Sequence, residues 1–216
     1  MGSTLSTLKT GLNTVLGVAE TTFKTEEART DAINYGLRRI LLRYDIPQYI
    51  TTETVSFTSG VASLPTGCLE PRKLFLSTAP RSPYLLVRPD DFDLNVSKTY
   101  KIAFDTASST EKMYIYPAST TSLSFRYLKL VELSAATDAI RLNSWWDKPI
   151  ATYAAAHLWK RERRYDLSEE LEKQADEEAA EAWQVESKRW QSNADTRLQS
   201  VFERRPILSD FNPRNA

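Results

Sequence analysis

The spacing of apolar residues changes twice along the chain. In residues 4–17 and 25–44 the apolar side chains recur at intervals of three and four positions, and Thr25 is placed to cap the second run. This spacing gathers apolar side chains on one face of a helix. From about residue 52 the apolar positions alternate with polar ones, which is typical of half-buried strands. Helical spacing returns at residue 143, so we expect helices at both ends of the chain.

The middle of the chain predicts antiparallel β structure over 52–130. Short alternating runs are separated by turn residues, and a hairpin is expected over 100–116. Pro80 and Pro83 are expected in a turn between two strands, because proline is a strong turn signal. The expected strands are 54–58, 61–64, 72–76, 84–88, 100–105, 112–116 and 123–130.

Two long helices are expected after residue 143, over 144–165 and 168–191. Asn143 or Ser144 is a candidate cap for the first, because a short side-chain oxygen accepts a hydrogen bond from a free N–H of the first turn. Asp166 followed by Glu169 has the spacing of a capping box at the start of the second. A short helix is also expected over 196–202. The second long helix has a narrow apolar stripe and heavily charged other faces. The residues along its stripe are Leu171, Ala175, Ala179, Ala182, Trp183, Glu186 and Trp190.

These patterns together indicate an α+β fold. Residues 1–50 and 143–203 are expected to form a helical bundle from the N-terminal helices and the long C-terminal helical pair. An antiparallel β subdomain is expected as an insertion at 51–142.

Residues 204–216 are expected to form an extended C-terminal tail. Pro206 and Pro213 prevent a regular helix or a central strand. Terminal segments of this composition are usually frayed, but this one carries apolar side chains that are better placed against another protein surface. The residues expected to dock are Arg204, Arg205, Pro206, Ile207, Leu208, Phe211 and Arg214.

Composition excludes several classes of protein. The 28 basic and 28 acidic residues cancel, so whole-chain charge gives no case for wrapping nucleic acid. The single cysteine, Cys68, excludes an internal disulfide and a thiolate metal cluster. No apolar run is long enough to cross a bilayer, and the N-terminus lacks an apolar signal-peptide core. We therefore expect a protein made and kept in a reducing cytoplasm, or carried from it inside a larger particle.

The sequence holds no specific catalytic constellation. His157 is the only histidine, and its place on a helix seam favours a core or interface role over catalysis. Asp90, Asp91 and Asp93 lack the spacing and the turn glycine of a calcium loop, which favours a solvated turn. We expect no enzyme activity, no cofactor and no metal site.

Charge is segregated along the long helical pair. A basic cluster at 160–164 is followed by an acidic stretch at 166–181. One interpretation is complementation of the helix dipoles together with a solvated helix face. The other is contact between neighbouring subunits, in a head-to-tail arrangement that closes into a ring. The candidate inter-subunit residues are Lys160, Arg161, Arg163, Arg164, Glu169, Glu170, Asp176 and Glu177. Tryptophans at 145, 146, 159, 183 and 190 crowd the same pair, through core packing or an interface.

The order of elements resembles a known family. The chain combines a capped helix, the strand opening TVSFTSGVASLPTGCLEPRKLFL, the turn VRPDDFD, a hairpin ending KMYIYPAS, the strand FRYLKLVELSAATDAI and the helix SWWDKPIATYAAAHLWKRERR. Over residues 4–190 it resembles the head-to-tail adaptor (connector) proteins of tailed bacteriophages, of the short-tailed type. The resemblance rests on element order and carries no catalytic signature.

The resemblance implies a structural role in the virion. Proteins of this family form a ring, usually a dodecamer, beneath the portal protein, and their C-terminal tail commonly reaches the portal. The expected partners are further copies of the chain, the portal protein, tail nozzle or tail fibre proteins, and packaged DNA that passes through the lumen without sequence-specific binding. No membrane is expected as a partner. The chain would be made in the host bacterial cytoplasm and reside at the head–tail junction of the virion.

Two other functions stay open on the sequence alone. One is a nucleic-acid-binding regulator that uses the basic cluster at 160–164, whose DNA binding should depend on salt. The other is a cell-wall hydrolase within the β region.

Overall fold

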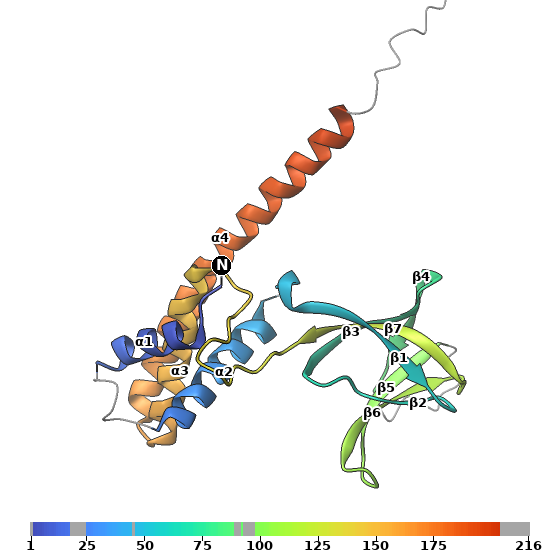
Figure 1. Cartoon of the computed structure of the whole chain (residues 1–216), viewed down its shortest axis with the longest axis horizontal. Coiled ribbons are helices and arrows are strands. Elements are labelled where there is room, and N and C mark those ends of the chain that lie inside the picture. The colour runs from blue at the N-terminus through green and yellow to red at the C-terminus, as the bar shows by residue number, and fades with distance from the viewer. Residues whose placement is uncertain (1, 18–24, 45, 89–91, 93–97, 204–216) are drawn as a thin grey trace, which may run out of the picture.

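The structure is a computed structural model that describes residues 2–17, 25–44, 46–88, 92 and 98–203, with no description of the side chains of 80, 81 and 190–203. Within these residues it contains four α-helices and a seven-stranded sheet, which confirms the α+β class. The helices form one part of the molecule, the sheet lies beside them, and the last helix extends away from both (Figure 1).

The elements follow the chain in the predicted order of helices, strands and helices. The helices are α1 (Leu5–Leu16), α2 (Glu26–Arg43), α3 (Asp147–Arg161) and α4 (Tyr165–Glu203), with short 3-10 helices η1 (Pro47–Tyr49) and η3 (Ser144–Trp146). The strands are β1 (Ile50–Phe57), β2 (Val61–Ser63), β3 (Cys68–Leu76), β4 (Ala79–Leu86), β5 (Thr99–Asp105), β6 (Thr110–Tyr116) and β7 (Thr121–Lys129).

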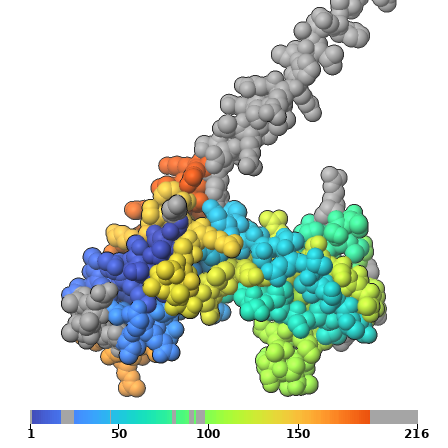
Figure 2. Space-filling view, viewed as in Figure 1, coloured from blue at the N-terminus to red at the C-terminus, as the bar shows by residue number. Residues whose placement is uncertain are grey.

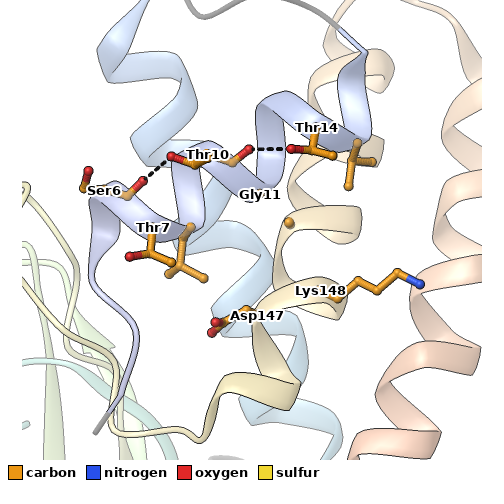
Figure 3. A pocket seen from close by; sticks show the side chains of 10 residues that line it. Ser6, Thr7, Thr10, Gly11, Thr14, Asp147 and Lys148 are labelled. Carbon is orange, nitrogen blue, oxygen red and sulfur yellow. Dashed lines mark hydrogen bonds between the residues drawn. The ribbon is translucent and has the colours of Figure 1, made fainter.

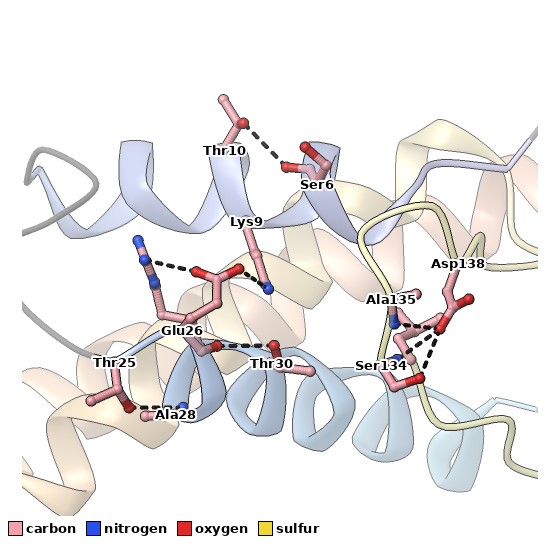
Figure 4. Close-up of polar contacts among 12 residues, drawn as sticks. Ser6, Lys9, Thr10, Thr25, Glu26, Ala28, Thr30, Ser134, Ala135 and Asp138 are labelled. Carbon is pink, nitrogen blue, oxygen red and sulfur yellow. Dashed lines mark hydrogen bonds and ion pairs between the residues drawn. The ribbon is translucent and has the colours of Figure 1, made fainter.

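The first two helices begin and end where their sequence signals lie. Thr4 Oγ1 accepts a hydrogen bond from the Thr7 N–H at 3.3 Å, and Thr25 Oγ1 accepts one from the Ala28 N–H at 3.3 Å. Gly17 ends α1 in the left-handed conformation, at φ 65°, which glycine adopts at little cost. Glu26 joins the two helices by binding Lys9 of α1 and Arg29 of its own helix (Figure 4). The Lys9 hydrogen bond is the main cause that lowers the pKa of the Glu26 carboxyl.

Helix α3 lies at the centre of the helical part and contacts α1, α2 and α4. The sequence predicted one buried face, but every residue from Pro149 to Ala156 is buried. Ala151 and residues 154–156, all alanines, let the neighbouring helices approach from several directions. Helix α3 is therefore a core helix, surrounded on most of its circumference.

Gly36 of α2 lies where α2 comes close to the backbone of α3, and its replacement is expected to destabilise the protein. A Cβ added at Gly36 would lie 2.5 Å from the Ile150 carbonyl oxygen of α3. Gly36→Ala should lose about 1–3 kcal/mol to overpacking, which outweighs the gain of about 0.5–1 kcal/mol in helix propensity. Gly11→Ala is the matched control, because its Cβ would meet only the Ala151 Cβ at 3.7 Å. Thermal unfolding followed by circular dichroism should show a lower Tm for Gly36→Ala and an unchanged or higher Tm for Gly11→Ala. Equal Tm values for the two variants would contradict this packing.

The sheet has the strand order β1-β7-β3-β4-β5-β6-β2 and is nearly closed. Its two end strands meet through the turn 58–60, where Thr58 bridges to Val61. The expectation of purely antiparallel pairing is wrong at one place, because β4 and β5 are parallel, with Leu85 opposite Thr99. The long connection 87–98 allows a crossover there instead of a hairpin. The predicted hairpin over 100–116 is confirmed as β5 and β6.

Pro80 and Pro83 lie within β4 and not in the expected turn. The turn between β3 and β4 is formed by residues 77 and 78 alone. Two prolines are tolerated in this strand because few of its residues pair with β3. The pairs are Leu74↔Tyr84 and Leu76↔Ala79.

Two separate apolar cores hold the molecule together. The helical core contains Trp146, which is fully buried, and the sheet core contains Phe125 and Tyr127, whose rings stack with centroids 5.1 Å apart. The paired strands β1 and β7 connect the two parts, and Figure 2 shows them as two lobes side by side.

The segment 130–142 lies against the helices. The Asn34 side chain of α2 accepts from the Leu133 N–H at 2.9 Å and donates to the Leu133 carbonyl at 3.0 Å. Leu133, Ile140 and Leu142 are buried in the helical core. The Asp138 carboxylate holds the turn by accepting from the N–H groups of Ser134 and Ala135 (Figure 4). The division of the chain at residues 50, 142 and 203 stays a prediction.

Candidate functional site

The turn between α3 and α4 carries the basic cluster. The Arg164 N–H donates to the Trp159 carbonyl at 3.0 Å, and the Arg163 N–H donates to the Lys160 carbonyl at 3.1 Å. This is the Schellman arrangement, in which the residue after the helix end takes a left-handed conformation that is usually left to glycine. Here Arg163 occupies that position, at φ 61°. The turn thus directs an arginine outward at the junction of the two helices.

Part of the predicted charge pairing occurs within one chain. Lys160 Nζ lies 3.9 Å from Glu172 Oε1, and Arg164 Nε lies 3.6 Å from Asp166 Oδ1. The guanidinium of Arg164 also lies over the Trp159 ring, 6.0 Å from its centre. All of these charged groups are at least 30% exposed, so solvent screening leaves each pair worth about 0–1 kcal/mol.

Asp176 is bound inside its own chain. Its carboxylate accepts a hydrogen bond from the Tyr153 hydroxyl of α3 and pairs with Arg43 at the end of α2. Burial, and then Asp176, raises the pKa of the Tyr153 hydroxyl. Asp176 of α4 therefore connects α2, α3 and α4 within one chain. A contact of Asp176 with a second subunit stays a prediction.

Five candidate inter-subunit residues remain on the surface. They are exposed and show no ion pair within the described part of the chain: Arg161, Arg163, Glu169, Glu170 and Glu177. Two of them are basic and lie at the α3–α4 turn, and three are acidic and lie within the first four turns of α4.

The expected capping of the long helices is wrong in both cases. Neither Asn143 nor Ser144 makes a capping bond, and α3 begins at Asp147 after the 3-10 helix η3. Helix α4 begins at Tyr165, one residue before Asp166, so Asp166 lies inside the first turn and does not cap it. It is also one helix to Glu203, with no separate helix over 196–202, because no proline or glycine interrupts it.

Buried Glu186 anchors α4 to the segments on both sides of the sheet, a role that the helical pattern of the sequence did not predict. Its side chain accepts hydrogen bonds from Gln48 Nε2 at 3.2 Å, Asn143 Nδ2 at 2.9 Å and Trp145 Nε1 at 3.0 Å. These donors come from the two segments that enter and leave the sheet. Arg189, one turn further on, donates to Asn143 Oδ1 at 3.4 Å. The sequence signal for this role is the position of Glu186, an acidic residue, within the apolar stripe of the helix.

The tryptophans divide between the core and the α4 contact. Tyr44 lies between Trp146 and Trp183, with ring centroids 5.4 and 5.5 Å away. Trp145 packs under Arg189, and Trp159 under Arg164. These four tryptophan rings make their contacts within the chain. The side chain of the fifth tryptophan, at position 190, is not among those that the structure describes.

Beyond the contacts of Glu186 and Arg189, α4 extends away from both lobes as an arm (Figure 1). We call residues 190–203 the α4 arm. A helix of this length reaches roughly 21 Å at 1.5 Å per residue. The expected docking tail follows it, and all seven of its candidate residues lie in 204–216, outside the described residues: Arg204, Arg205, Pro206, Ile207, Leu208, Phe211 and Arg214.

A surface groove of about 610 Å³ lies between α1 and the start of α3 (Figure 3). Thr7, Thr10 and Thr14 of α1 form one wall, and Asp147 and Lys148 of α3 form the other. Thr10 and Thr14 donate to backbone carbonyls of their own helix, and Ser3 donates to Asp147. Burial is the main cause that raises the pKa of the Asp147 carboxyl. The groove is lined by threonine hydroxyl groups and by apolar side chains. Its lining residues do not place a nucleophile next to a general base, so the groove does not resemble a catalytic site.

The other candidate groups do not form a reaction centre among the described residues. His157 stacks on Tyr35 with ring centroids 4.1 Å apart, and burial, with Arg161 and Lys160, lowers its pKa. Asp90, Asp91 and Asp93 lie outside the described residues. In the described part of the chain, no three histidine, cysteine, aspartate or glutamate side chains gather as a metal site. None of the described helices is both long enough and apolar enough to span a bilayer.

Two lobes, a charged helix turn and a projecting helix are typical of a protein built around contact surfaces. The comparisons agree with that class. A family model described as SU10 adaptor protein matches residues 3–201. The chain therefore belongs to the SU10 adaptor protein family, a family of bacteriophage head-to-tail adaptors, and is a structural component of a phage particle. A comparison with curated proteins finds no match.

Proposed function

We propose that this protein forms a ring at the head–tail junction, where it joins the portal to the tail and surrounds part of the DNA passage. The observation that carries the proposal is the family match over residues 3–201, nearly the whole chain. The α4 arm supports it, because a helix that leaves its own domain is suited to reach another chain (Figure 1).

In the proposed ring, each subunit contacts its neighbours, the portal and the tail. Twelve copies form the ring, with the exposed residues of the α3–α4 turn near the acidic face of α4 in the next subunit. The tail at 204–216 docks on the portal, and the opposite side meets tail nozzle or tail fibre proteins. DNA passes through the lumen without sequence-specific contacts.

Heads purified from a phage that lacks this gene provide the functional test. Added protein should bind the portal vertex and allow tails to attach, as counted by electron microscopy. Heads that gain tails equally well without the protein would contradict the adaptor role.

The inter-subunit charge contact predicts a specific effect on assembly. Arg161→Glu, Arg163→Glu and Arg164→Glu together should weaken ring formation and reduce its dependence on salt, because opposite charges are replaced by like ones. The matched control changes the same residues to lysine and keeps the charge. Each exposed pair is worth only about 0–1 kcal/mol, so a loss of roughly tenfold in assembly affinity is expected by sedimentation. Unchanged assembly of the glutamate variant would remove the electrostatic part of the proposal.

The two rival functions are tested by separate assays. A regulator that binds DNA through 160–164 would show salt-dependent binding by the isolated chain. Two of its cations, Lys160 and Arg164, already have acidic neighbours in the same chain, which disfavours this role. A hydrolase would clear a cell-wall zymogram, and the proposal expects no clearing.

A further inference from the structure

The turn between α3 and α4 presents basic and aromatic side chains at the end of the helical pair. Two of its four basic residues, Lys160 and Arg164, have acidic neighbours at 3.9 and 3.6 Å in the same chain. Arg161 and Arg163 are exposed and show no ion pair within the described residues. Tyr165 follows them and is 56% exposed. We call Arg161, Arg163 and Tyr165 the turn patch, and the turn that carries it projects from the end of the helical lobe (orange, lower left in Figure 2).

Arg163 occupies a position that costs stability. It follows the end of α3 in the left-handed conformation, at φ 61°, which residues other than glycine adopt at a cost. Its N–H donates to the Lys160 carbonyl at 3.1 Å, a backbone bond that glycine would make equally well. Strain of this kind at an exposed arginine points to a role for its side chain outside its own chain.

An acidic stripe runs along another side of α4. Glu170, Glu177 and Glu181 recur at seven and four positions, which places them on one face of the helix, and all three are exposed without an ion pair in the part of the chain that the structure describes. Glu177 and Glu181 are four residues apart, and like charges at this spacing destabilise a helix. Tyr165, five residues before Glu170, lies about 140° away around the helix. The turn patch and the acidic stripe are therefore distinct surfaces of one chain.

We propose that the turn patch of one subunit binds the acidic stripe of the next, with Arg163 as the central cation. The two surfaces are complementary in charge, and each carries a cost in the isolated chain that the contact offsets. Tyrosine and arginine are also enriched among the residues that dominate interface energies. Because the two surfaces differ, the contact is head-to-tail, the type that closes into a ring. The inference rests on the proposed function for the ring itself.

Mixing two charge-reversed variants tests the contact. The first carries Arg161→Glu and Arg163→Glu, and the second carries Glu170→Arg and Glu177→Arg. Each variant alone brings like charges together, so each should need a roughly tenfold higher concentration than wild type to form rings. In an equal mixture every contact is complementary if the variants alternate, and alternation closes a ring with an even number of subunits. Sedimentation of the mixture should show rings near the wild-type concentration, and native mass spectrometry should count equal copies of the two variants.

Two results of the mixing experiment would overturn the proposal. One is a mixture that assembles no better than either variant alone, and the other is wild-type assembly of either variant by itself. If the wild-type protein forms rings and attaches tails while the mixture fails, the adaptor role stands and this contact falls.

Substitution of Arg163 alone separates binding from folding, and it decides the question if a charge-reversed variant does not fold. Arg163→Gly relieves the left-handed conformation and should raise Tm by roughly 2–4 °C. It should nevertheless weaken ring formation about fivefold, because the cation is lost. Arg163→Lys is the matched control, which keeps the charge and should leave both Tm and ring formation near wild type. Ring formation by Arg163→Gly at the wild-type concentration would show that Arg163 has no role in the contact.

Discussion

Removal of residues 204–216 is expected to abolish stable attachment to the portal and to leave the folded domain intact. Both buried cores are made of residues between Leu5 and Ala182, so truncation after Glu203 removes nothing from them. The tail contributes three apolar anchors, Ile207, Leu208 and Phe211. Burial of each is worth about 1.5–3 kcal/mol. Ordering costs roughly 1–2 kcal/mol per residue, so binding also needs backbone hydrogen bonds and repetition around the ring.

The affinity of the full-length and truncated proteins for purified portal measures this effect. Loss of even two anchors should weaken binding by at least about 100-fold, since 1.4 kcal/mol corresponds to a factor of ten. The Tm of the truncated protein should be unchanged. Ser209→Ala is the matched control within the tail, because it keeps all three anchors. Wild-type portal affinity of the truncated protein would show that the tail does not dock.

Glu186→Ala is expected to be the most destabilising change at the base of α4. It leaves the donors of Gln48, Asn143 and Trp145 without their acceptor. Each donor that stays buried costs about 1–3 kcal/mol. Gln48, Asn143 and Trp145 are only partly buried, so about 3–6 kcal/mol is expected, at the lower end of the sum for three fully buried donors. In a chain of 216 residues this lowers Tm by roughly 6–24 °C. The α4 arm should also lose its fixed direction, which small-angle scattering would detect as a broader distribution of distances.

Glu186→Gln separates hydrogen bonding from charge. Its carbonyl oxygen can still accept from Asn143 and Trp145, and its amide can donate to Gln48 after the Gln48 amide turns over. Gln48 Oε1 is buried without a hydrogen-bond partner, so it is available for this bond. We expect a Tm much nearer to wild type than that of Glu186→Ala. Equal losses in the two variants would mean that the charge, and not the hydrogen bonds, holds the arm.

The sequence predicted those elements whose signals are local. Thr25 caps α2 as predicted, because a cap acts on its own neighbouring turn. Alternation located the strands, and the β5–β6 hairpin followed from a short polar loop. The parallel pairing of β4 with β5 was missed because it depends on where a long connection crosses, which the strand pattern does not encode.

The candidate site was predicted less well because its residues serve the fold as well as the surface. Asp176 has the same acidic character as Glu177, but only the fold places Asp176 beside Tyr153 and Arg43. The cap at Asn143 was wrong because its side chain is engaged by Glu186 and Arg189, 43 and 46 positions away. Contacts over such separations are set by packing, and a local motif does not reveal them.

Native mass spectrometry of the protein with and without purified portal tests the central claim most directly. We predict a single closed assembly on the portal, with twelve copies of this chain per portal ring. A chain that stays monomeric at high concentration with portal present would contradict the adaptor ring.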